Sequence, residues 1–406
     1  PCACTNTSTA QNPAHQRQRL LVHRRADMAT DRAGAVEPEA KLPSLLQPPM
    51  TALAGPVLGL ETSCDETAVA LVHHRQVLTS RVATQIPLHA RFGGVVPEVA
   101  ARSHLLTVLP TLAQALADAG LQGQQLGGIA VTHRPGLIGA LLVGVQTAKA
   151  LAMAWQLPLI GVDHIAAHIW ASQLIPPGPV ASDWQPPALP FAALAVSGGH
   201  TSLYRVDGPD QLTLLGRTLD DAAGEAFDKV GKLMGLDYPA GPVVDRLAAD
   251  GDPTRFALNK GMTGRTDGAY SFSGIKTAMR LQWQALQANG TPTEQDRADL
   301  CAALQHAIVE QLARVTLQSM QRVGLERLVV AGGVAAKRAL RSHLTAVCGR
   351  AGIAVFPVAP AYCTDNAAMV AGLGEALLLA GHRDDPHTLD ALPTGQVRRS
   401  TAPQGS

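Results

Sequence analysis

The stretch VLGLETSCDETAVALVHH at residues 57–74 decides the fold, because it joins two apolar runs through a short polar turn. VLGL and AVALV have the apolar, partly β-branched composition of buried strands. A similar arrangement, FAALAVSGGHTSLYRV, occupies residues 191–206. When Ser63 is aligned with Ser197, the threonines four residues further on also align. The sequence therefore predicts two copies of one strand–turn–strand unit, which indicates a duplicated domain.

Outside these hairpins, short apolar runs alternate with helical segments. Residues 294–323 have the strongest helical period, with Thr293 as the expected cap and Gly324 as the expected stop. Strands that feed helices through glycine turns are typical of largely parallel α/β sheets, whose sites lie at the carboxyl ends of the strands. Further buried strands are expected at 128–132, 158–162, 328–330 and 353–358, and a helix is expected to run from the 331–333 turn through Leu344.

The chain divides into two α/β lobes and three connecting or terminal segments. A segment with six prolines lies between the lobes and is expected to form an ordered linker, since each proline fixes φ and blocks helix formation. The expected parts are an N-terminal extension at 1–55 that is disordered or not part of the gene, a first lobe at 56–175 completed by a helix at 366–380, the linker at 176–190, a second lobe at 191–365, and a loose tail at 382–406.

The first 26 residues contain four arginines and no acidic residue. An organelle transit peptide has this composition, and so does arbitrary sequence before an overlong gene start. We favour the second interpretation, because Met50 lies seven residues before the first expected strand. Deletion of residues 1–49 is then expected to leave folding intact.

Composition excludes several classes of protein. The net charge is +1, so any nucleic-acid surface must be a local patch. Six scattered cysteines without CxxC spacing predict reduced thiols rather than a disulfide framework. The apolar run at 139–145 is followed by Gln146 and Lys149, well short of the roughly 18 residues that span a bilayer. We expect a cytoplasmic protein with no membrane contact, or an organellar one if the extension is a transit peptide.

Three turns are candidate anion sites. Backbone N–H groups at turns and at helix N-termini bind phosphate or carboxylate groups. Any one such turn is more often a simple corner, but two hairpin turns and a Gly-Gly turn in this order are more specific. The three turns are ETSCDET at 61–67, VSGGHT at 196–201 and AGGV at 331–334.

A candidate metal site begins with His164 and His168, which are four residues apart after an expected strand. Their imidazoles can share one helix face, although capping or packed histidines would have the same spacing. The residues between them lack the glutamate of HExxH, which removes the general base of a zinc peptidase. Asp365 offers a third ligand at the start of the last long helix. Two imidazoles and one carboxylate suit one divalent transition metal, Fe²⁺ foremost and Zn²⁺ as the alternative.

Long motifs spread over residues 57–379 resemble one known family. The chain closely resembles the bacterial tRNA N6-adenosine threonylcarbamoyltransferases, formerly labelled O-sialoglycoprotein endopeptidases. The resemblance implies an actin/Hsp70/sugar-kinase-like α/β fold (ASKHA), with two ribonuclease-H-like lobes around a cleft. The motifs, in order, are LGLETSCDETAVAL, HARFGGVVPEVAARSH, PGLIGALLVG, VSGGHTSL, DDAAGEAFDKVGKLMGLDYPAGP, SFSGIKTA, AGGVAAKRALR and CTDNAAM.

The resemblance also implies an activity and its residues. The reaction is transfer of a threonylcarbamoyl group from threonylcarbamoyl-AMP to N6 of the adenosine 3′ of the anticodon, in tRNAs that read codons beginning with A. His164, His168 and Asp365 match the family's metal ligands. The implied partners are tRNA, a catalytically silent paralogue and a P-loop ATPase. The matching substrate-contacting positions are Val196, Ser197, Gly198, Gly199, His200, Asp228, Gly241 and Asp245.

The chain departs from the family pattern at three places. Lys337 stands where Asn is usual, His133 and Arg134 replace a small pair, and Asp163 stands where His is common. Lys337 is expected in the first turn of its helix, where its cation either binds the adenylate phosphate or extends into solvent.

Mechanism and competing functions are also open at this stage. Asp65 and Glu66 are candidate acceptors of the amine proton, or they only cap their turn. A kinase or ATPase on the same fold is the main alternative function. A silent partner-binding paralogue is a second alternative, which the three candidate metal ligands disfavour.

Overall fold

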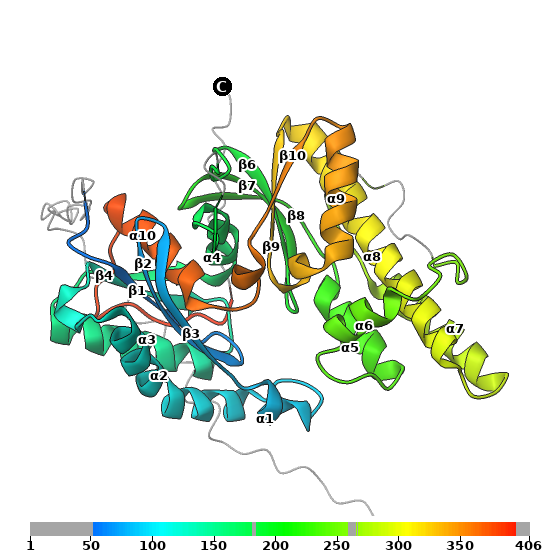
Figure 1. Ribbon diagram of the computed structural model, residues 1–406, viewed down its shortest axis with the longest axis horizontal. Coiled ribbons are helices and arrows are strands. Elements are labelled where there is room, and N and C mark those ends of the chain that lie inside the picture. Colours follow the sequence, from blue (N-terminus) through cyan, green and yellow to red (C-terminus); the bar gives the residue numbers. More distant parts are fainter. Residues whose placement is uncertain (1–51, 181–183, 259–264, 266, 395–406) are drawn as a thin grey trace, which may run out of the picture. The chain divides into compact units, whose positions relative to one another are not determined.

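Two five-stranded mixed sheets form the framework of the protein (Figure 1). The computed structural model describes residues 52–180, 184–258, 265 and 267–394. Most of the expected N-terminal extension therefore lies outside the described residues. Residues 52–55, which were assigned to that extension, belong to the fold, because Leu53 is buried in the core. Together these residues form an α/β protein with one sheet in each lobe.

The first sheet has the order β3-β2-β1-β4-β5. The expected hairpin forms β1 and β2, and a third strand continues it antiparallel, whereas β4 and β5 run parallel to β1. The strands are β1 (Val57–Glu61), β2 (Glu66–His73), β3 (Gln76–Thr84), β4 (Gly128–Arg134) and β5 (Leu159–Asp163).

The second sheet repeats this arrangement in the order β8-β7-β6-β9-β10. A meander of three antiparallel strands is again followed by two parallel strands, with β6 in the place of β1. The duplication predicted from the two hairpins is therefore confirmed at the level of topology. The strands are β6 (Phe191–Val196), β7 (Thr201–Gly208), β8 (Gln211–Arg217), β9 (Arg327–Ala331) and β10 (Ala354–Pro357).

Helices cover both faces of the first sheet. The short α1 (Ile86–Ala90) precedes α2 (Pro97–Ala119), which packs with α3 (Ile138–Trp155) on one face. The late helix α10 (Ala367–Leu379) packs against β1 and β4 on the other face. Gly59 allows this approach, because a Cβ there would overlap the backbone of α10.

Helix α3 meets the length and hydropathy criterion for crossing a membrane, which the sequence argument denied. The interruptions at Gln146 and Lys149 are too few to fail that criterion. In the structure, Leu141, Val145 and Ala148 of this helix are buried in the first-lobe core. Core helices of globular domains meet the same criterion, and the burial accounts for the apolar composition.

The second lobe packs its longest helix under the second sheet. Helix α8 (Glu294–Val323) begins at the predicted cap Thr293, whose hydroxyl accepts a hydrogen bond from Asp296 N–H. It ends at Gly324, which has a left-handed φ of 66°. The other helices of this lobe are α5 (Ala223–Leu233), α6 (Ala240–Ala248), α7 (Ser273–Ala288) and α9 (Arg338–Arg350). Short 3₁₀ segments occur in the first lobe at Gly123–Gln125 and Ala171–Gln173, and later in the chain at Gly333–Ala336 and Pro360–Tyr362.

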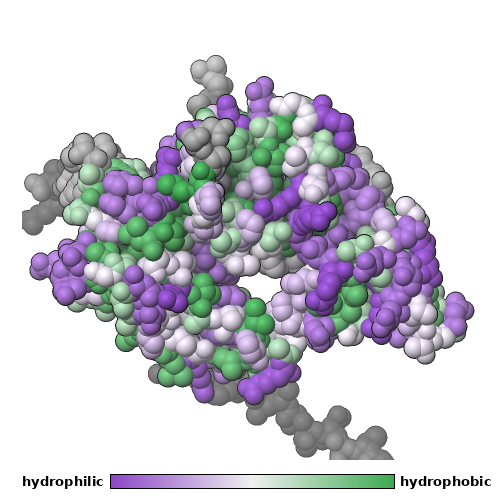
Figure 2. Space-filling view, viewed as in Figure 1, coloured by the Kyte–Doolittle hydropathy of each residue, from purple (hydrophilic) through white to green (hydrophobic). Residues whose placement is uncertain are grey.

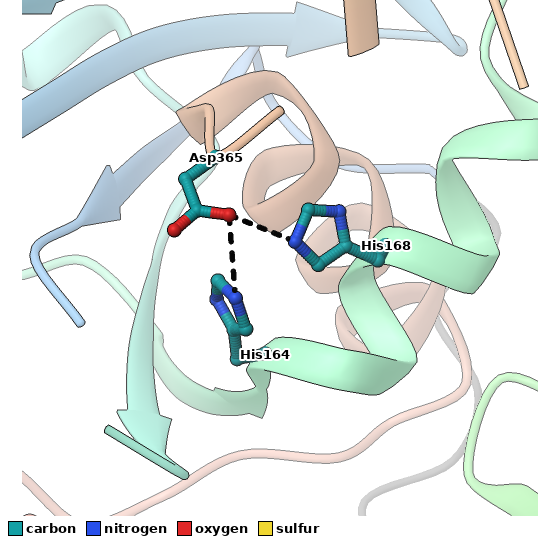
Figure 3. A group of neighbouring side chains, drawn as sticks. All are labelled: His164, His168 and Asp365. Carbon is teal, nitrogen blue, oxygen red and sulfur yellow. Dashed lines mark hydrogen bonds and ion pairs between the residues drawn. The ribbon is translucent and has the colours of Figure 1, made fainter. Parts of the chain in front are cut away.

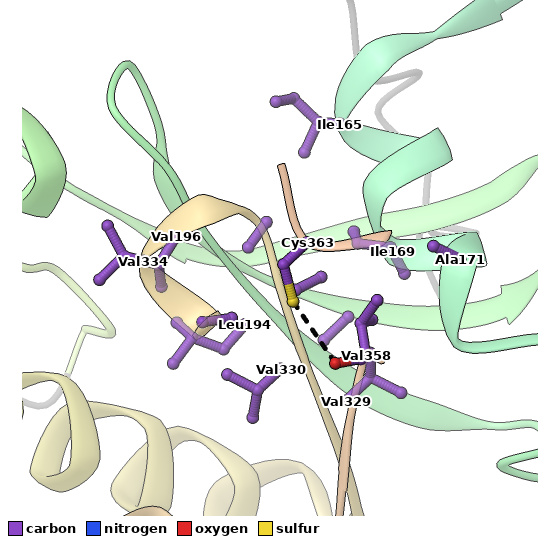
Figure 4. Packing of buried hydrophobic residues seen from close by; sticks show 14 of the residues in the cluster. Ile165, Ile169, Ala171, Leu194, Val196, Val329, Val330, Val334, Val358 and Cys363 are labelled. Atoms are coloured by element: carbon purple, nitrogen blue, oxygen red, sulfur yellow. Dashed lines mark hydrogen bonds between the residues drawn. The ribbon is translucent and has the colours of Figure 1, made fainter. Parts of the chain in front are cut away.

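The two lobes meet at α4 (His164–Trp170), which follows β5. Ile165 and Ile169 of this helix belong to the same buried cluster as Leu194 of β6 and Val329 of β9 (Figure 4). The helix is thereby packed between an apolar sheet face and α10. Packing on both sides gives α4 a defined position, which matters because its first turn begins the candidate site.

Two expected segments differ from the structure. Residues 382–394 are not a loose tail, because Leu389 is buried in the first-lobe core and Asp384 accepts a hydrogen bond from Gly161 N–H. The Gly-Gly turn does not lead directly into α9 either, because a 3₁₀ turn, Gly333–Ala336, comes first. The linker has no helix or strand among its described residues 176–180 and 184–190, in agreement with its proline content.

Candidate active site

The three predicted turns all lie at the carboxyl ends of parallel strands. The turn at 62–65 follows β1, the turn at 197–200 follows β6, and the Gly-Gly turn follows β9. Glycines allow these turns to pack closely against the rest of the chain. A Cβ on Gly136 would lie 2.7 Å from the carbonyl oxygen of Ser63, and one on Gly224 would lie 2.5 Å from that of Ser197. Each hairpin turn therefore rests on a glycine from another element.

His164, His168 and Asp365 converge at one point (Figure 3). The two histidines lie one turn apart on α4, and Asp365 lies just before α10. Asp365 Oδ1 is 3.0 Å from His168 Nε2 and 3.5 Å from His164 Nε2. The spacing of four residues therefore places both imidazoles on one helix face, as the sequence predicted, and the fold brings Asp365 to the same place.

The three side chains fit a divalent transition metal. One potential ligand atom from each lies within 4.8 Å of the others, and both histidines are buried. Burial alone would lower the pKa of His164, but the carboxylates of Glu61 and Asp365 raise that pKa well above its usual value. A cluster that favours a proton between two carboxylates also favours a metal cation there.

Asp163 gives this helix its N-terminal cap. Its Oδ1 accepts hydrogen bonds from the backbone N–H groups of Ile165 and Ala166, at 2.9 and 3.2 Å. Its Oδ2 lies 3.4 Å from Arg134 Nε. Arg134 and Asp163, two of the departures noted in the sequence, are therefore partners in one ion pair beside the candidate metal ligands.

The first turn places two carboxyl groups next to this cluster. His104 of α2 donates from Nε2 to the carbonyl oxygen of Cys64, at 3.0 Å, and so holds the turn from behind. Burial and the nearby carboxylates of Asp365 and Asp65 raise the pKa of Glu66 to about 9. Glu66 is therefore protonated more readily than a solvent-exposed glutamate, and Asp65 lies close enough to influence it.

The second turn is closed by two hydrogen bonds between its own residues. Ser197 N–H donates to the carbonyl oxygen of His200 at 2.8 Å, and His200 N–H donates to Ser197 Oγ at 3.2 Å. Gly198 and Gly199 have open space at their Cβ positions, so a ligand can approach their backbone. Burial and the charges of His164 and His168 lower the pKa of His200 to about 4. Its imidazole is therefore neutral at physiological pH.

A cavity of about 350 Å³ adjoins the second turn. Asp228 is fixed at its wall, because its Oδ1 accepts a hydrogen bond from Ala240 N–H at 2.9 Å. Val196, at the end of β6, lies beneath the turn and is fully buried. Thr364, next to the candidate ligand Asp365, belongs to the same wall. Of the positions predicted to contact substrate, those that line this cavity are Gly198, Asp228, Gly241, Asp245 and Lys337.

Lys337 lies in this wall rather than in solvent. Only 8% of the residue is exposed, which rules out the solvent-extended alternative. Its Nζ donates to the carbonyl oxygen of Gly241 at 2.5 Å and lies 3.7 Å from Asp245 Oδ1 and 4.6 Å from the centre of the Phe227 ring. It is the N-cap of α9, not a first-turn residue, since the 3₁₀ segment delays the helix. Asp245 supplies an anion that the sequence argument did not consider.

Sequence reasoning missed two buried groups of the site, Glu61 and His104. Both are completely buried; Glu61 contacts the predicted metal ligand His164, and His104 contacts Cys64 in the turn that carries Asp65 and Glu66. A glutamate at the end of an apolar strand was the available signal for Glu61, because a buried carboxylate needs partners. His104 offered no comparable signal, since a single histidine in a helix is more often a packed residue.

Comparisons with known proteins show the family of the chain. The family described as "TsaD: tRNA N6-adenosine threonylcarbamoyltransferase" matches residues 76–372. A tRNA N6-adenosine threonylcarbamoyltransferase from Sorangium cellulosum is 50% identical over 347 residues, which cover 83% of this chain and 97% of that protein.

Solved structures support the fold at low sequence identity. HypF from T. kodakarensis matches with a TM-score of 0.52 and 14% identity, over 83% of this chain and 49% of that protein. Full-length HypF in a phosphate- and nucleotide-bound form matches with a TM-score of 0.50 and 12% identity, over 85% and 48%. The chain spans about half the length of these proteins. The likeness supports the actin/Hsp70/sugar-kinase-like fold and no more.

Proposed function

Because this chain belongs to the tRNA N6-adenosine threonylcarbamoyltransferase family, we propose that it transfers threonylcarbamoyl from threonylcarbamoyl-AMP to N6 of the adenosine 3′ of the anticodon. The substrates are tRNAs that read codons beginning with A. The observation that carries the proposal is the convergence of His164, His168 and Asp365 beside a cavity of about 350 Å³. A nucleotide in that cavity would have its reactive end next to the three side chains.

The second lobe would bind the donor. The open backbone at Gly198 and Gly199 offers N–H groups to anionic oxygens, and Asp228 and Asp245 offer carboxylates to sugar hydroxyls. Because Asp228 is held by the hydrogen bond from Ala240 N–H and Asp245 lies 3.7 Å from Lys337 Nζ, binding orients the donor without much loss of side-chain freedom. The chain would therefore contribute mainly by positioning an already activated carbonyl.

His164, His168 and Asp365 would hold one divalent transition metal, which we propose to be Fe²⁺, with Zn²⁺ as the alternative. Such a metal supplies Lewis-acid polarisation of oxygen atoms when it is bound. The two imidazoles are neutral nitrogen ligands and Asp365 is an anionic one, a donor set that suits both ions. Anaerobic purification followed by elemental analysis would distinguish the two metals.

The first lobe would take up the proton. Attack of the N6 lone pair on the carbamoyl carbon breaks the bond to phosphate, and AMP leaves with the electron pair. One N6 proton must then be accepted. We propose that Asp65 or Glu66 accepts it, because both carboxyl groups belong to the turn that lies near Asp365. The transfer rates of Asp65→Asn and Glu66→Gln, measured across pH, would distinguish the two candidates.

We also propose that the chain works in the cytoplasm with a catalytically silent paralogue and a P-loop ATPase. The support on this molecule is an apolar strip on α2, made of Leu105, Leu106 and Leu109, which are 65%, 78% and 58% exposed. Figure 2 shows apolar side chains at the surface over this part of the first lobe. Contiguous exposed leucines are unfavourable in water and are typical of a protein interface. A Leu106→Asp variant should lose the paralogue in a pull-down yet keep its own fold.

Mass spectrometry of tRNA nucleosides tests the proposal. Unmodified tRNA is incubated with this protein, its partners and threonylcarbamoyl-AMP, and the threonylcarbamoylated nucleoside is expected only when this chain and the donor are both present. A tRNA set whose anticodons read no codon beginning with A is the matched control. Hydrolysis of ATP or transfer of its phosphate by the isolated protein, without nucleoside modification, would instead support a kinase or ATPase.

A further inference from the structure

Glu61 is a buried carboxylate that the proposed chemistry does not use. It ends β1 and has no exposed surface. Its Oε1 accepts the backbone N–H of Ser63 at 2.6 Å, and its Oε2 accepts the hydroxyl of Thr132 at 2.5 Å. The same Oε2 lies 3.1 Å from His164 Nδ1. Since a buried charge is costly, three converging donors indicate a built position rather than chance.

The contact with His164 determines which ring nitrogen faces the cluster. Nδ1 points to Glu61, and Nε2 points to Asp365 Oδ1 at 3.5 Å. An imidazole that donates Nδ1–H to a carboxylate presents the lone pair of Nε2 on its other side. Ser63 Oγ is also within 3.3 Å of Nδ1, but this contact is longer and the hydroxyl is neutral. The charged and shorter partner is therefore the dominant one.

His168 has no comparable support. Its Nε2 faces Asp365 in the same way, but its buried Nδ1 has no hydrogen-bond partner among the described residues. The two histidines are thus unequal, although they lie on one helix face. Only His164 is connected to the first sheet, through Glu61 to Thr132 on the neighbouring strand β4.

We propose that Glu61 is a positioning residue, which fixes the ring of His164 so that Nε2 is directed at the metal. Glu61 acts through His164 and contacts neither substrate nor metal. The inference rests on the metal centre proposed above. Outer-shell partners of this kind typically change metal affinity by about 10- to 100-fold.

Zn²⁺ binding by the full chain tests this role without any measurement of transfer. Zn²⁺ affinity is measured by competition with a chromophoric chelator in the wild type, Glu61→Gln and Glu375→Gln. Glu375 is a matched control, because its buried carboxylate accepts hydrogen bonds from His74 and Arg75 N–H at the opposite end of β2. We expect about 10- to 100-fold weaker binding for Glu61→Gln and less than about threefold change for Glu375→Gln.

A second readout reports the ring itself. In ¹⁵N spectra of histidine-labelled protein with Zn²⁺ bound, wild-type His164 should be protonated at Nδ1, and Glu61→Gln should show line broadening or a mixture of states there. A merely structural role would lower the melting temperature without this change. If Glu61→Gln does not fold, Thr132→Val provides the test, because it removes one donor to Oε2 and should weaken Zn²⁺ binding by a smaller factor.

The outcomes separate the two proposals. Wild-type protein that binds neither Zn²⁺ nor, under anaerobic conditions, Fe²⁺ would refute the metal centre and, with it, the role of Glu61. Tight wild-type binding that is unchanged in Glu61→Gln, or weakened equally in Glu375→Gln, would refute only the role of Glu61. For a Glu61→Gln variant that does not fold, unchanged Zn²⁺ affinity in Thr132→Val would do the same.

Discussion

The two hairpin turns share one topology but differ in what braces them. The turn after β1 is held by buried side chains, with Glu61 at its start and His104 behind Cys64. The turn after β6 is held by two hydrogen bonds between Ser197 and His200, one between backbone groups and one from His200 N–H to the Ser197 hydroxyl. Strand pairing depends on backbone groups that every residue has, so a duplicated fold can keep its sheets while its turns diverge.

The difference in bracing matches a difference in charge. The first turn brings Asp65 and Glu66 near Asp365, which makes that side of the site acidic and suited to a cation or a proton. The second turn exposes backbone at Gly198 and Gly199, which suits an anion. One topology, used twice, therefore provides two complementary surfaces, as the proposed binding of an adenylate and a metal requires.

Loss of a metal ligand from the acidic half should have the largest effect. His164→Ala or His168→Ala should reduce Zn²⁺ or Fe²⁺ affinity by more than about 100-fold, since loss of a ligand should exceed the 10- to 100-fold cost of an outer-shell change. Isothermal titration and elemental analysis measure this. His343→Ala, a half-buried histidine of the second lobe paired with Glu310, is the control. Undiminished metal content in His164→Ala would show that the metal does not bind in this half of the site.

Changes at Lys337 should affect only the anion-binding half. If Lys337 interacts with the donor phosphate, loss of a charged hydrogen bond of roughly 1.5 to 3 kcal/mol weakens donor binding by about 10- to 150-fold in Lys337→Ala. Lys337→Asn should keep most affinity, and Lys337→Glu should be worst, because it adds a third carboxylate beside Asp228 and Asp245. Equal affinities for threonylcarbamoyl-AMP across the series would mean that Lys337 contacts Gly241 and Asp245 but not the donor.

The glycines behind the turns test whether both turns need close support. Gly136→Ala and Gly224→Ala each place a methyl group within 2.7 Å of a turn carbonyl, and backbone cannot move as cheaply as a side chain. We expect each to cost about 1 to 3 kcal/mol in unfolding free energy, as overpacking usually does. Urea unfolding measures the loss. Gly274→Ala, in open space on α7, should be neutral or slightly stabilising.

Acid should lower the free energy of unfolding through protonation of His104, which supports the first turn. Burial lowers the pKa of His104, so between its folded pKa and its usual value near 6.5 the unfolded chain binds more protons than the folded one. Stability therefore falls as the pH drops through about 6.5. Urea unfolding with a chelator present, at pH 7.5 and 5.5, should show a larger loss in the wild type than in His104→Gln. Equal losses would mean that other groups dominate the acid response.

Much of the fold could be read from local pattern. The two hairpins and α8 with its cap and stop were predictable, because apolar period and capping residues act over a few neighbouring positions. The spacing of His164 and His168 was a local signal of the same kind. Residues 382–394 were misjudged because their polar, proline-bearing sequence hides a few buried contacts, such as that of Leu389.

The sequence by itself determined the two hairpins, the parallel strands, the longest helix, the duplication and, by resemblance, the family. Only the tertiary structure decided which distant groups meet. Glu61 and His164 are 103 positions apart and Lys337 and Gly241 are 96 apart, yet each pair is within hydrogen-bonding distance. Short-range periodicity holds no information about such pairs, because they form only when separate strands and helices pack. The partner of a buried charge is therefore a property of the packed core, whereas the element that holds the charge is a property of the local sequence.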